Sequence, residues 1–148
     1  MTDIKTLNDN LRKHLTGGKI VLTQGIEAKT YEEIAEIMLK IRHFNNFTPD
    51  NDPYNEHDFG SFDYKGEKIF WKIDYYDKNY QYLSEDPANP NLTNRVMTVR
   101  LLTIHKNKLN MHPHSKNEFD NFLQSDKNFY IQMMKNNLIV LHLVLFLV

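Results

Sequence analysis

The sequence predicts a single α+β domain, with a mainly antiparallel sheet, a central β-hairpin and two to three covering helices. Two segments carry apolar residues at helical spacing, and two aromatic-rich segments with strand-like alternation are joined by a tight turn. Hairpin-linked strands with only a few helices are typical of this class, in which the sheet is covered on one face. The 148 residues fit one such domain. We expect a core domain over residues 1–110 and a helical, hydrophobic extension over residues 111–148.

The first predicted elements are a helix over residues 4–15 and a strand over residues 19–23. Gly17 and Gly18 follow the helix and supply its C-terminal stop. The strand is a short β-branched run, which its length and composition predict to be buried. The apolar face of the helix comprises Ile4, Leu7, Leu11 and Leu15.

A second helix is predicted from residue 31 to near Phe44. Thr30 and Glu33 have the spacing of a capping box, in which each side chain accepts a hydrogen bond from the other residue's backbone N–H. Two asparagines and then Pro49 follow Phe44, and these residues do not continue a helix comfortably. The apolar face of this helix comprises Tyr31, Ile34, Met38 and Ile41.

A β-hairpin is predicted over residues 58–64 and 67–76, because Lys65-Gly66 suits a tight turn between them. Alternation gives the second strand two different faces. One face carries Ile69, Trp71, Ile73 and Tyr75, and the other carries Phe70, Lys72, Asp74 and Tyr76. We expect the tryptophan face to be the core, packed against Tyr31, Ile34 and Met38 of the second helix.

The remaining elements of the core domain follow from turn residues and β-branched content. Residues 45–56 predict an ordered loop, residues 80–83 a short strand and residues 86–91 a rigid turn that contains two prolines. Residues 95–104 allow a helix, but their β-branched content favours a central strand.

The extension after residue 110 contains two apolar features. Ser115 and Glu118 form a second capping box, which opens a helix with Phe119, Phe122 and Leu123 inward. The apolar run at residues 138–148 has roughly half of the ~20 residues that a transmembrane helix needs. Three interpretations of this run stay open: it docks on the core, it touches a membrane, or it is a tail translated after a frameshift.

Composition excludes several classes of function. The net charge of −1 gives no support for binding driven by bulk charge, so we expect no direct binding to nucleic acid. The chain has no cysteine, which excludes disulfides, thiolate metal sites and cysteine nucleophiles. The N-terminal residues lack the apolar region of a signal peptide, so the expected location is cytoplasmic. We expect no cofactor.

The most unusual segment for its charge is residues 50–77, where eight acidic residues and three lysines give a net charge of −5. Tyrosines and phenylalanines lie between these charges, a combination that suits a protein-binding surface with electrostatic steering. The sequence therefore favours a non-enzymatic interaction domain, and a basic nucleic-acid-binding protein is the kind of partner it fits. A solvated loop and hairpin is the simpler alternative. The candidate binding residues are Asp50, Asp52, Tyr54, Glu56, His57, Asp58, Asp74 and Tyr76.

A metal-dependent hydrolase or nuclease is the alternative function. If this segment is extended, Glu56 and Asp58 would share a face, and Asp74 could join them across a sheet to hold a divalent cation through carboxylate oxygens. His57 or Lys72 would then assist proton transfer. This hypothesis requires that the three carboxyl groups converge in a cleft.

An architectural role is the third expectation for the loop. We predict that Asp52 or Asn51 caps the turn at Pro53, and that His57 or Asp58 bonds to the loop backbone. Such bonds are needed because ordering a loop without regular structure costs about 1 kcal/mol or more per residue in backbone entropy.

Two motifs carry a resemblance to a known family. NDPYNEHDFG at residues 51–60 and FWKIDYYD at residues 70–77 resemble the NDPYGEHDFG-like and FWKIDYYD-like motifs of a small bacterial family of unknown function. The resemblance covers residues 7–104 and includes LNDNLRKHLTGGKIVLTQGI, FTPDNDP and DPANPNLTNRVMTVRLLTI. Asn55 stands where the family pattern has Gly, so the bend of this loop can differ from that of its relatives. The resemblance implies a compact cytoplasmic domain encoded near plasmid and mobile-element genes, hence a host-defence or plasmid-maintenance setting, and it implies no activity.

Overall fold

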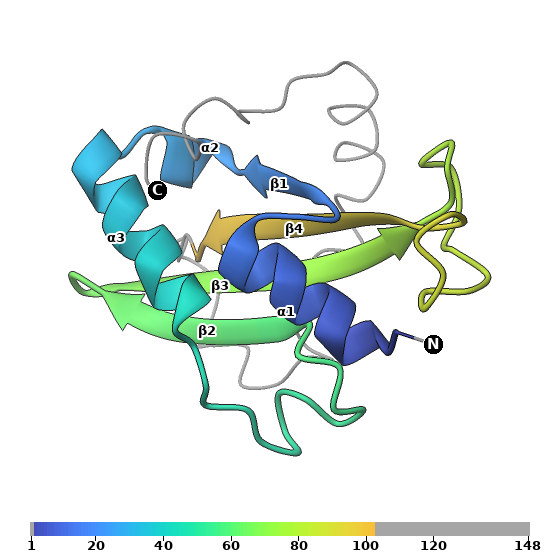
Figure 1. Ribbon diagram of the computed structural model, residues 1–148. Coiled ribbons are helices and arrows are strands. Elements are labelled where there is room, and N and C mark those ends of the chain that lie inside the picture. Colours follow the sequence, from blue (N-terminus) through green and yellow to red (C-terminus); the bar gives the residue numbers. More distant parts are fainter. Residues whose placement is uncertain (1, 103–148) are drawn as a thin grey trace, which may run out of the picture.

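The structure, a computed structural model, describes residues 2–102. The predicted class is confirmed, because these residues form a four-stranded, mostly antiparallel sheet with a β-hairpin and three helices (Figure 1). The helix expected after Ser115, the apolar run at 138–148 and the boundary expected near residue 110 lie outside the described residues. The elements are α1 (Ile4–His14), β1 (Lys19–Leu22), α2 (Gln24–Glu27), α3 (Tyr31–Arg42), β2 (Phe59–Tyr64), β3 (Glu67–Tyr76) and β4 (Asn94–Leu101).

The sheet has the strand order β1-β4-β3-β2. β3 is antiparallel to both of its neighbours, whereas β1 runs parallel to β4. Lys65 and Gly66 join β2 to β3 with φ angles of +48° and +81°. Positive φ at both central residues matches the twist of the flanking strands, as the hairpin prediction requires.

Two short elements differ from the sequence prediction. α2 is a four-residue helix, and a single turn carries no periodic signal by which it could be predicted. The strand expected at residues 80–83 is reduced to one bridge, which joins Leu83 to Tyr76 at the end of β3.

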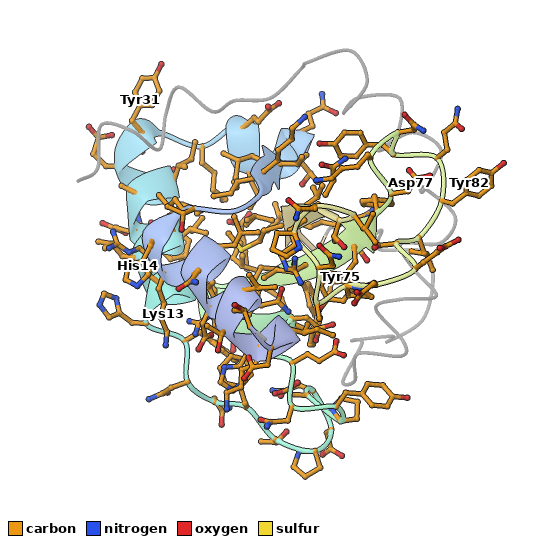
Figure 2. The ribbon with its side chains drawn as sticks, turned by 45° about the vertical axis from the view of Figure 1, so that its right-hand side comes forward. Lys13, His14, Tyr31, Tyr75, Asp77 and Tyr82 are labelled. Carbon is orange, nitrogen blue, oxygen red and sulfur yellow. The ribbon has the colours of Figure 1, made fainter. Side chains whose placement is uncertain are left out.

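The predicted start of α3 is confirmed, but one residue that we expected on its buried apolar face is exposed. Thr30 and Glu33 form the predicted capping box, with the Thr30 hydroxyl accepting from the Glu33 N–H at 3.2 Å. Ile34 and Met38 are buried, whereas Tyr31 is 70% exposed. Tyr31 is the first residue of α3, at the end of the helix that projects past the sheet, and its ring points outward (Figures 1 and 2).

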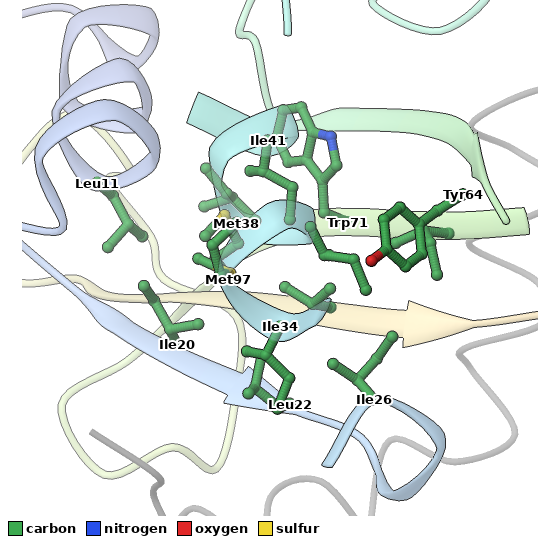
Figure 3. Packing of buried hydrophobic residues seen from close by; sticks show 14 residues of the cluster. Leu11, Ile20, Leu22, Ile26, Ile34, Met38, Ile41, Tyr64, Trp71 and Met97 are labelled. Carbon is green, nitrogen blue, oxygen red and sulfur yellow. The ribbon is translucent and has the colours of Figure 1, made fainter. Parts of the chain in front are cut away.

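The main core lies between the three helices and one face of the sheet, here called the front face (Figure 3). Trp71 and Ile73 are 0% and 1% exposed, as predicted. Gly60 pairs with Trp71 across the hairpin, and a Cβ at Gly60 would lie 2.6 Å from Trp71 Nε1. Only glycine therefore leaves room for the indole. The cluster comprises Leu11, Ile20, Leu22, Ile26, Ile34, Ile37, Met38, Ile41, Tyr64, Ile69, Trp71, Ile73, Met97 and Val99.

The opposite face of the sheet, here called the back face, is also shielded from solvent. Phe59 and Phe70 are 2% and 1% exposed, and Val96 is 1% exposed. Lys72 and Asp74 form an ion pair on this face at 2.8 Å, with side chains that are 13% and 21% exposed. Within residues 2–102 the helices cover the front face alone, as expected, and the central residues of the back face are buried as well.

Candidate functional site

The loop at residues 45–58 is held first by its own polar side chains. Asp52 Oδ1 accepts hydrogen bonds from the backbone N–H groups of Glu56 at 2.8 Å and His57 at 3.2 Å. Asn51 Oδ1 accepts from the N–H of Thr48 at 2.9 Å. The predicted caps are thus present, and they close both halves of the loop around Pro53.

His57 connects this loop to α1. Its Nδ1 lies 3.1 Å from Asp9 Oδ1, and its Nε2 lies 3.9 Å from Asp52 Oδ2. The imidazole stacks on the Phe47 ring with centroids 3.8 Å apart and planes within 4°. The His57 backbone has a φ of +53°, a conformation that is uncommon outside glycine. The contacts of the His57 ring are thus with side chains, and the alternative that Asp58 bonds to the loop backbone stays a prediction.

Arg12 is 1% exposed, and its guanidinium carbon lies 5.4 Å from the centroid of the Phe47 ring. One of its terminal nitrogens donates to the carbonyl oxygens of Ile41, Arg42 and Phe44, at 2.9, 3.0 and 3.0 Å. The other donates to Asp9 Oδ1 at 2.8 Å. Arg12 therefore satisfies carbonyls at the C-terminal end of α3, where no further helical N–H is available.

Asp9 is the acid that links Arg12 and His57. Burial on its own would raise the pKa of Asp9, but hydrogen bonds from Arg12, His57 and Lys13 outweigh it and hold the pKa below its ordinary value. The carboxylate is therefore ionised at neutral pH, and it joins α1 to the loop through charge-assisted bonds.

A second set of polar contacts surrounds Asn8, which is 0% exposed. Asn8 Nδ2 donates to the Glu56 carbonyl at 2.9 Å and to the Tyr75 hydroxyl at 2.7 Å. The Tyr75 hydroxyl donates in turn to the Glu56 carboxylate at 3.1 Å. Arg95 Nε donates to Asn8 Oδ1 at 3.0 Å, and Arg95 also bonds to the Pro87 carbonyl. These contacts bring the two motifs, the 45–58 loop and the loop at residues 77–93 together beside α1.

The electrostatics of this set follow from burial. Burial raises the pKa of Tyr75, and the nearby carboxylate of Asp58 adds to the effect. Burial also lowers the pKa of Arg95, while Glu56 opposes this shift. Tyr75 therefore remains a neutral donor, and its ring lies 5.2 Å from the Arg95 guanidinium carbon. We call Asn8, Asp9, Arg12, Glu56, His57, Tyr75 and Arg95 the α1 cluster.

The structure separates the candidate binding residues into three groups. Asp50 and Tyr54 are exposed on the loop. Asp52 and Asp58 are buried, and Glu56 and His57 are half-buried within the α1 cluster. Asp74 and Tyr76 lie on the back face, where Asp74 pairs with Lys72 and burial raises the pKa of Tyr76. The eight residues do not form one continuous surface.

The carboxylate set proposed for a metal ion does not form. Among residues 2–102, no three His, Asp or Glu side chains are grouped so that they could hold a metal. The Glu56 carboxylate accepts from Tyr75, and Asp74 is paired with Lys72 on the back face. The convergence that the hydrolase or nuclease hypothesis requires is therefore contradicted by the geometry.

Two surface hollows lie near these elements. One, of about 260 Å³, is lined by loop residues that include Phe47, Asp52 and Asn55. Another, of about 540 Å³, lies at the start of α3 and is lined by residues that include Leu22, Lys29 and Tyr31. Neither hollow is lined by a residue of the α1 cluster.

Sequence reasoning did not identify Asn8, Asp9, Arg12 and Arg95 as members of the site. One signal was available: Arg12 follows Asn8 by four residues and Asp9 by three, and side chains at these spacings are neighbours on a helix. The burial of Arg95 has no comparable local signal, since it depends on α1 and on the 77–93 loop.

Together, fold and site define a small α+β domain whose two sequence motifs meet in a buried polar network. The chain belongs to the family described as "Protein of unknown function (DUF3768)", whose family model matches residues 22–103. This match includes the 45–58 loop and β3, while α1 precedes it. Neither a curated protein nor a solved structure matches the chain. Within residues 2–102, no helix has the length and apolar character needed to cross a bilayer.

Proposed function

We propose that this domain is a non-enzymatic protein-binding module that presents the 45–58 loop to a basic partner. The observation that carries the proposal is the Tyr54 side chain, which is 76% exposed. Tyrosines placed in this way are frequent anchors of protein interfaces, because they bury a large area at a low cost in side-chain entropy.

The order of the loop supports this role. Asn51 and Asp52, just before Tyr54, fix the backbone by accepting hydrogen bonds from Thr48, Glu56 and His57. A loop that is ordered before it binds loses less conformational entropy on association. Tyr54 is therefore presented from a pre-organised support.

Charge defines the class of partner. Asp50 is exposed close to Tyr54 in sequence, within the segment of net charge −5. An acidic, aromatic loop is complementary to a surface of lysine and arginine, and such complementarity steers association. A basic nucleic-acid-binding protein fits this description, and the family resemblance extends the proposal to a cytoplasmic host-defence or mobile-element setting.

The experiment compares Tyr54→Ala and Asp50→Asn with matched controls at exposed sites outside the loop, Tyr31→Ala and Glu32→Gln. Each full-length variant is used to capture proteins from a bacterial lysate at low and high salt, with quantification by mass spectrometry. We expect a basic protein to be enriched by the wild type and the controls and lost from both loop variants. High salt should weaken its capture.

The same set of captured proteins for all five chains would contradict the proposal. Circular dichroism and thermal unfolding of each variant show that the loss of a partner is not a loss of the fold. Tyr31 is a suitable control because it is 70% exposed, close to the 76% of Tyr54.

A further inference from the structure

The burial of the back face is not explained by the helices of the described structure. Its central rows contain Val21, Phe59, Phe70, Val96 and Thr98, which are between 1% and 6% exposed. The buried apolar side chains of the three helices belong instead to the front-face cluster. Within residues 2–102, the partly buried hydrophobic neighbours of the back-face clusters are Leu102 and Tyr80. Two side chains are too few to cover four strands.

The ion pairs on this face show the same pattern. Lys72 and Asp74, in the middle of β3, have side chains that are 13% and 21% exposed. Lys68 and Asp63, near the hairpin turn, have side chains that are 31% and 76% exposed. The shielding is therefore concentrated over the centre of the face and decreases toward the turn.

The chain leaves the described structure on this face. Leu102 packs against Phe59 and Phe70, and its N–H donates to the Lys68 carbonyl at 2.9 Å. The run at residues 138–148 contains no Asp, Glu, Lys or Arg, and 35 residues separate it from Leu102. At a maximum reach of about 3.3 Å per residue, 35 residues are more than enough to span the sheet.

We propose that the back face is the docking surface for the chain's own apolar run at residues 138–148. Burial of this run against Phe59, Phe70 and Val96 removes apolar area from water on both sides. The covalent connection favours this occupant over a separate molecule, because it raises the effective concentration of the run to the millimolar range.

The absence of cysteine from the chain permits a direct test in the full-length protein. Ser61→Cys places a thiol on the back face opposite Phe70, and Leu143→Cys places one in the run. The control pair combines Leu143→Cys with Leu39→Cys, since Leu39 lies on α3 and is 47% exposed. In a second series, Val144→Cys replaces Leu143→Cys, so that two adjacent positions of the run are tested for cross-linking. A short bismaleimide joins the thiols in dilute protein.

We expect at least one Ser61 pair to give about tenfold more cross-linked monomer than its Leu39 control, because docking adds to the proximity that the tether alone provides. Equal yields from the two pairs would overturn the proposal. Covalent dimers in place of cross-linked monomer would assign the face to a second copy of the chain. No monomeric cross-link, together with sedimentation of the wild type on phosphatidylglycerol vesicles, would assign the run to a membrane.

Discussion

The two long loops of the domain, at residues 45–58 and 77–93, are held in different ways. The first is attached to another element. On α1, Asp9 binds the His57 ring and Asn8 binds the Glu56 carbonyl. Arg12 binds the Phe44 carbonyl, just before the loop begins.

The 77–93 loop is held mainly by its own residues. Asp77 accepts hydrogen bonds from the N–H groups of Asn79 and Gln81. Thr93 closes the loop by donating to the Asp86 carbonyl at 2.8 Å and bonding to the Ser84 hydroxyl at 2.7 Å. The bond from Arg95 to a loop carbonyl ties it to the α1 cluster. Changes in α1 should therefore loosen the first loop more than the second.

The largest expected effect is that of Arg12→Ala. This change removes a buried cation and takes one hydrogen-bond donor from each of three carbonyl groups and from Asp9. We therefore expect a loss of about 3–5 kcal/mol in the free energy of unfolding. Urea denaturation measures it. Lys13→Ala is the control, because Lys13 contacts the same Asp9 carboxylate but is 45% exposed, and its loss should be below about 1 kcal/mol. Similar losses for the two variants would show that Arg12 does not hold this region.

A smaller effect is expected for Thr93→Val, which keeps the shape of the side chain and removes its hydroxyl. Thr93 is 5% exposed, and its loss of two hydrogen bonds should cost about 1–3 kcal/mol. Limited proteolysis with mass spectrometry should show faster cleavage within residues 77–93 and unchanged cleavage within 45–58. Faster cleavage of both loops would mean that they open as one unit.

A third prediction concerns the pH dependence of the attachment through Asp9. The pKa of Asp9 is lowered in the folded chain, so its stabilising contribution is present above the ordinary carboxyl pKa and is lost as the pH falls below about 4. Asp9→Asn should therefore be less stable than the wild type at pH 6, and the difference should narrow toward pH 3. Urea midpoints across this range measure it, and a constant difference would contradict the assignment.

The smallest effect is expected at Asn55, in the middle of the 45–58 loop. Asn55 has a φ of +55°, and Asn adopts this left-handed conformation more readily than most residues. The loop therefore accommodates Asn at a bend that suits Gly, and Asn55→Gly should change the free energy of unfolding by less than about 0.5 kcal/mol. Asn55→Ala should cost about 1 kcal/mol. Urea denaturation of the Asn55→Gly and Asn55→Ala variants measures this difference. Equal stability of the two variants would show that the positive φ at residue 55 does not affect stability.

Local signals in the sequence were sufficient for most of the fold. The capping box at Thr30, the turn at Lys65-Gly66 and the alternation of β3 each depend on residues only a few positions apart. The parallel pairing of β1 with β4 was not predictable in this way, because it joins Lys19 to Val96. The alternation of β3 also does not predict that the back face is buried, because burial of that face depends on which other residues pack on it.

The candidate site was predicted only in part for the same reason. Asp52 was identified as a cap because its partners, Glu56 and His57, lie within five residues of it. Asp9 and Arg12 have the pattern of a solvated helix face. They are covered because a loop more than thirty residues later in the chain folds across them, and no local pattern encodes that contact.

The position of Trp71 gives the domain an optical reporter of loop attachment. It is the only tryptophan in the chain, and its ring lies 5.6 Å from Phe44 and 6.3 Å from Phe47, at the start of the 45–58 loop. Detachment of this loop would admit water to the indole and shift its emission to longer wavelength. Opening of the region that presents Tyr54 can therefore be followed by intrinsic fluorescence, without a label.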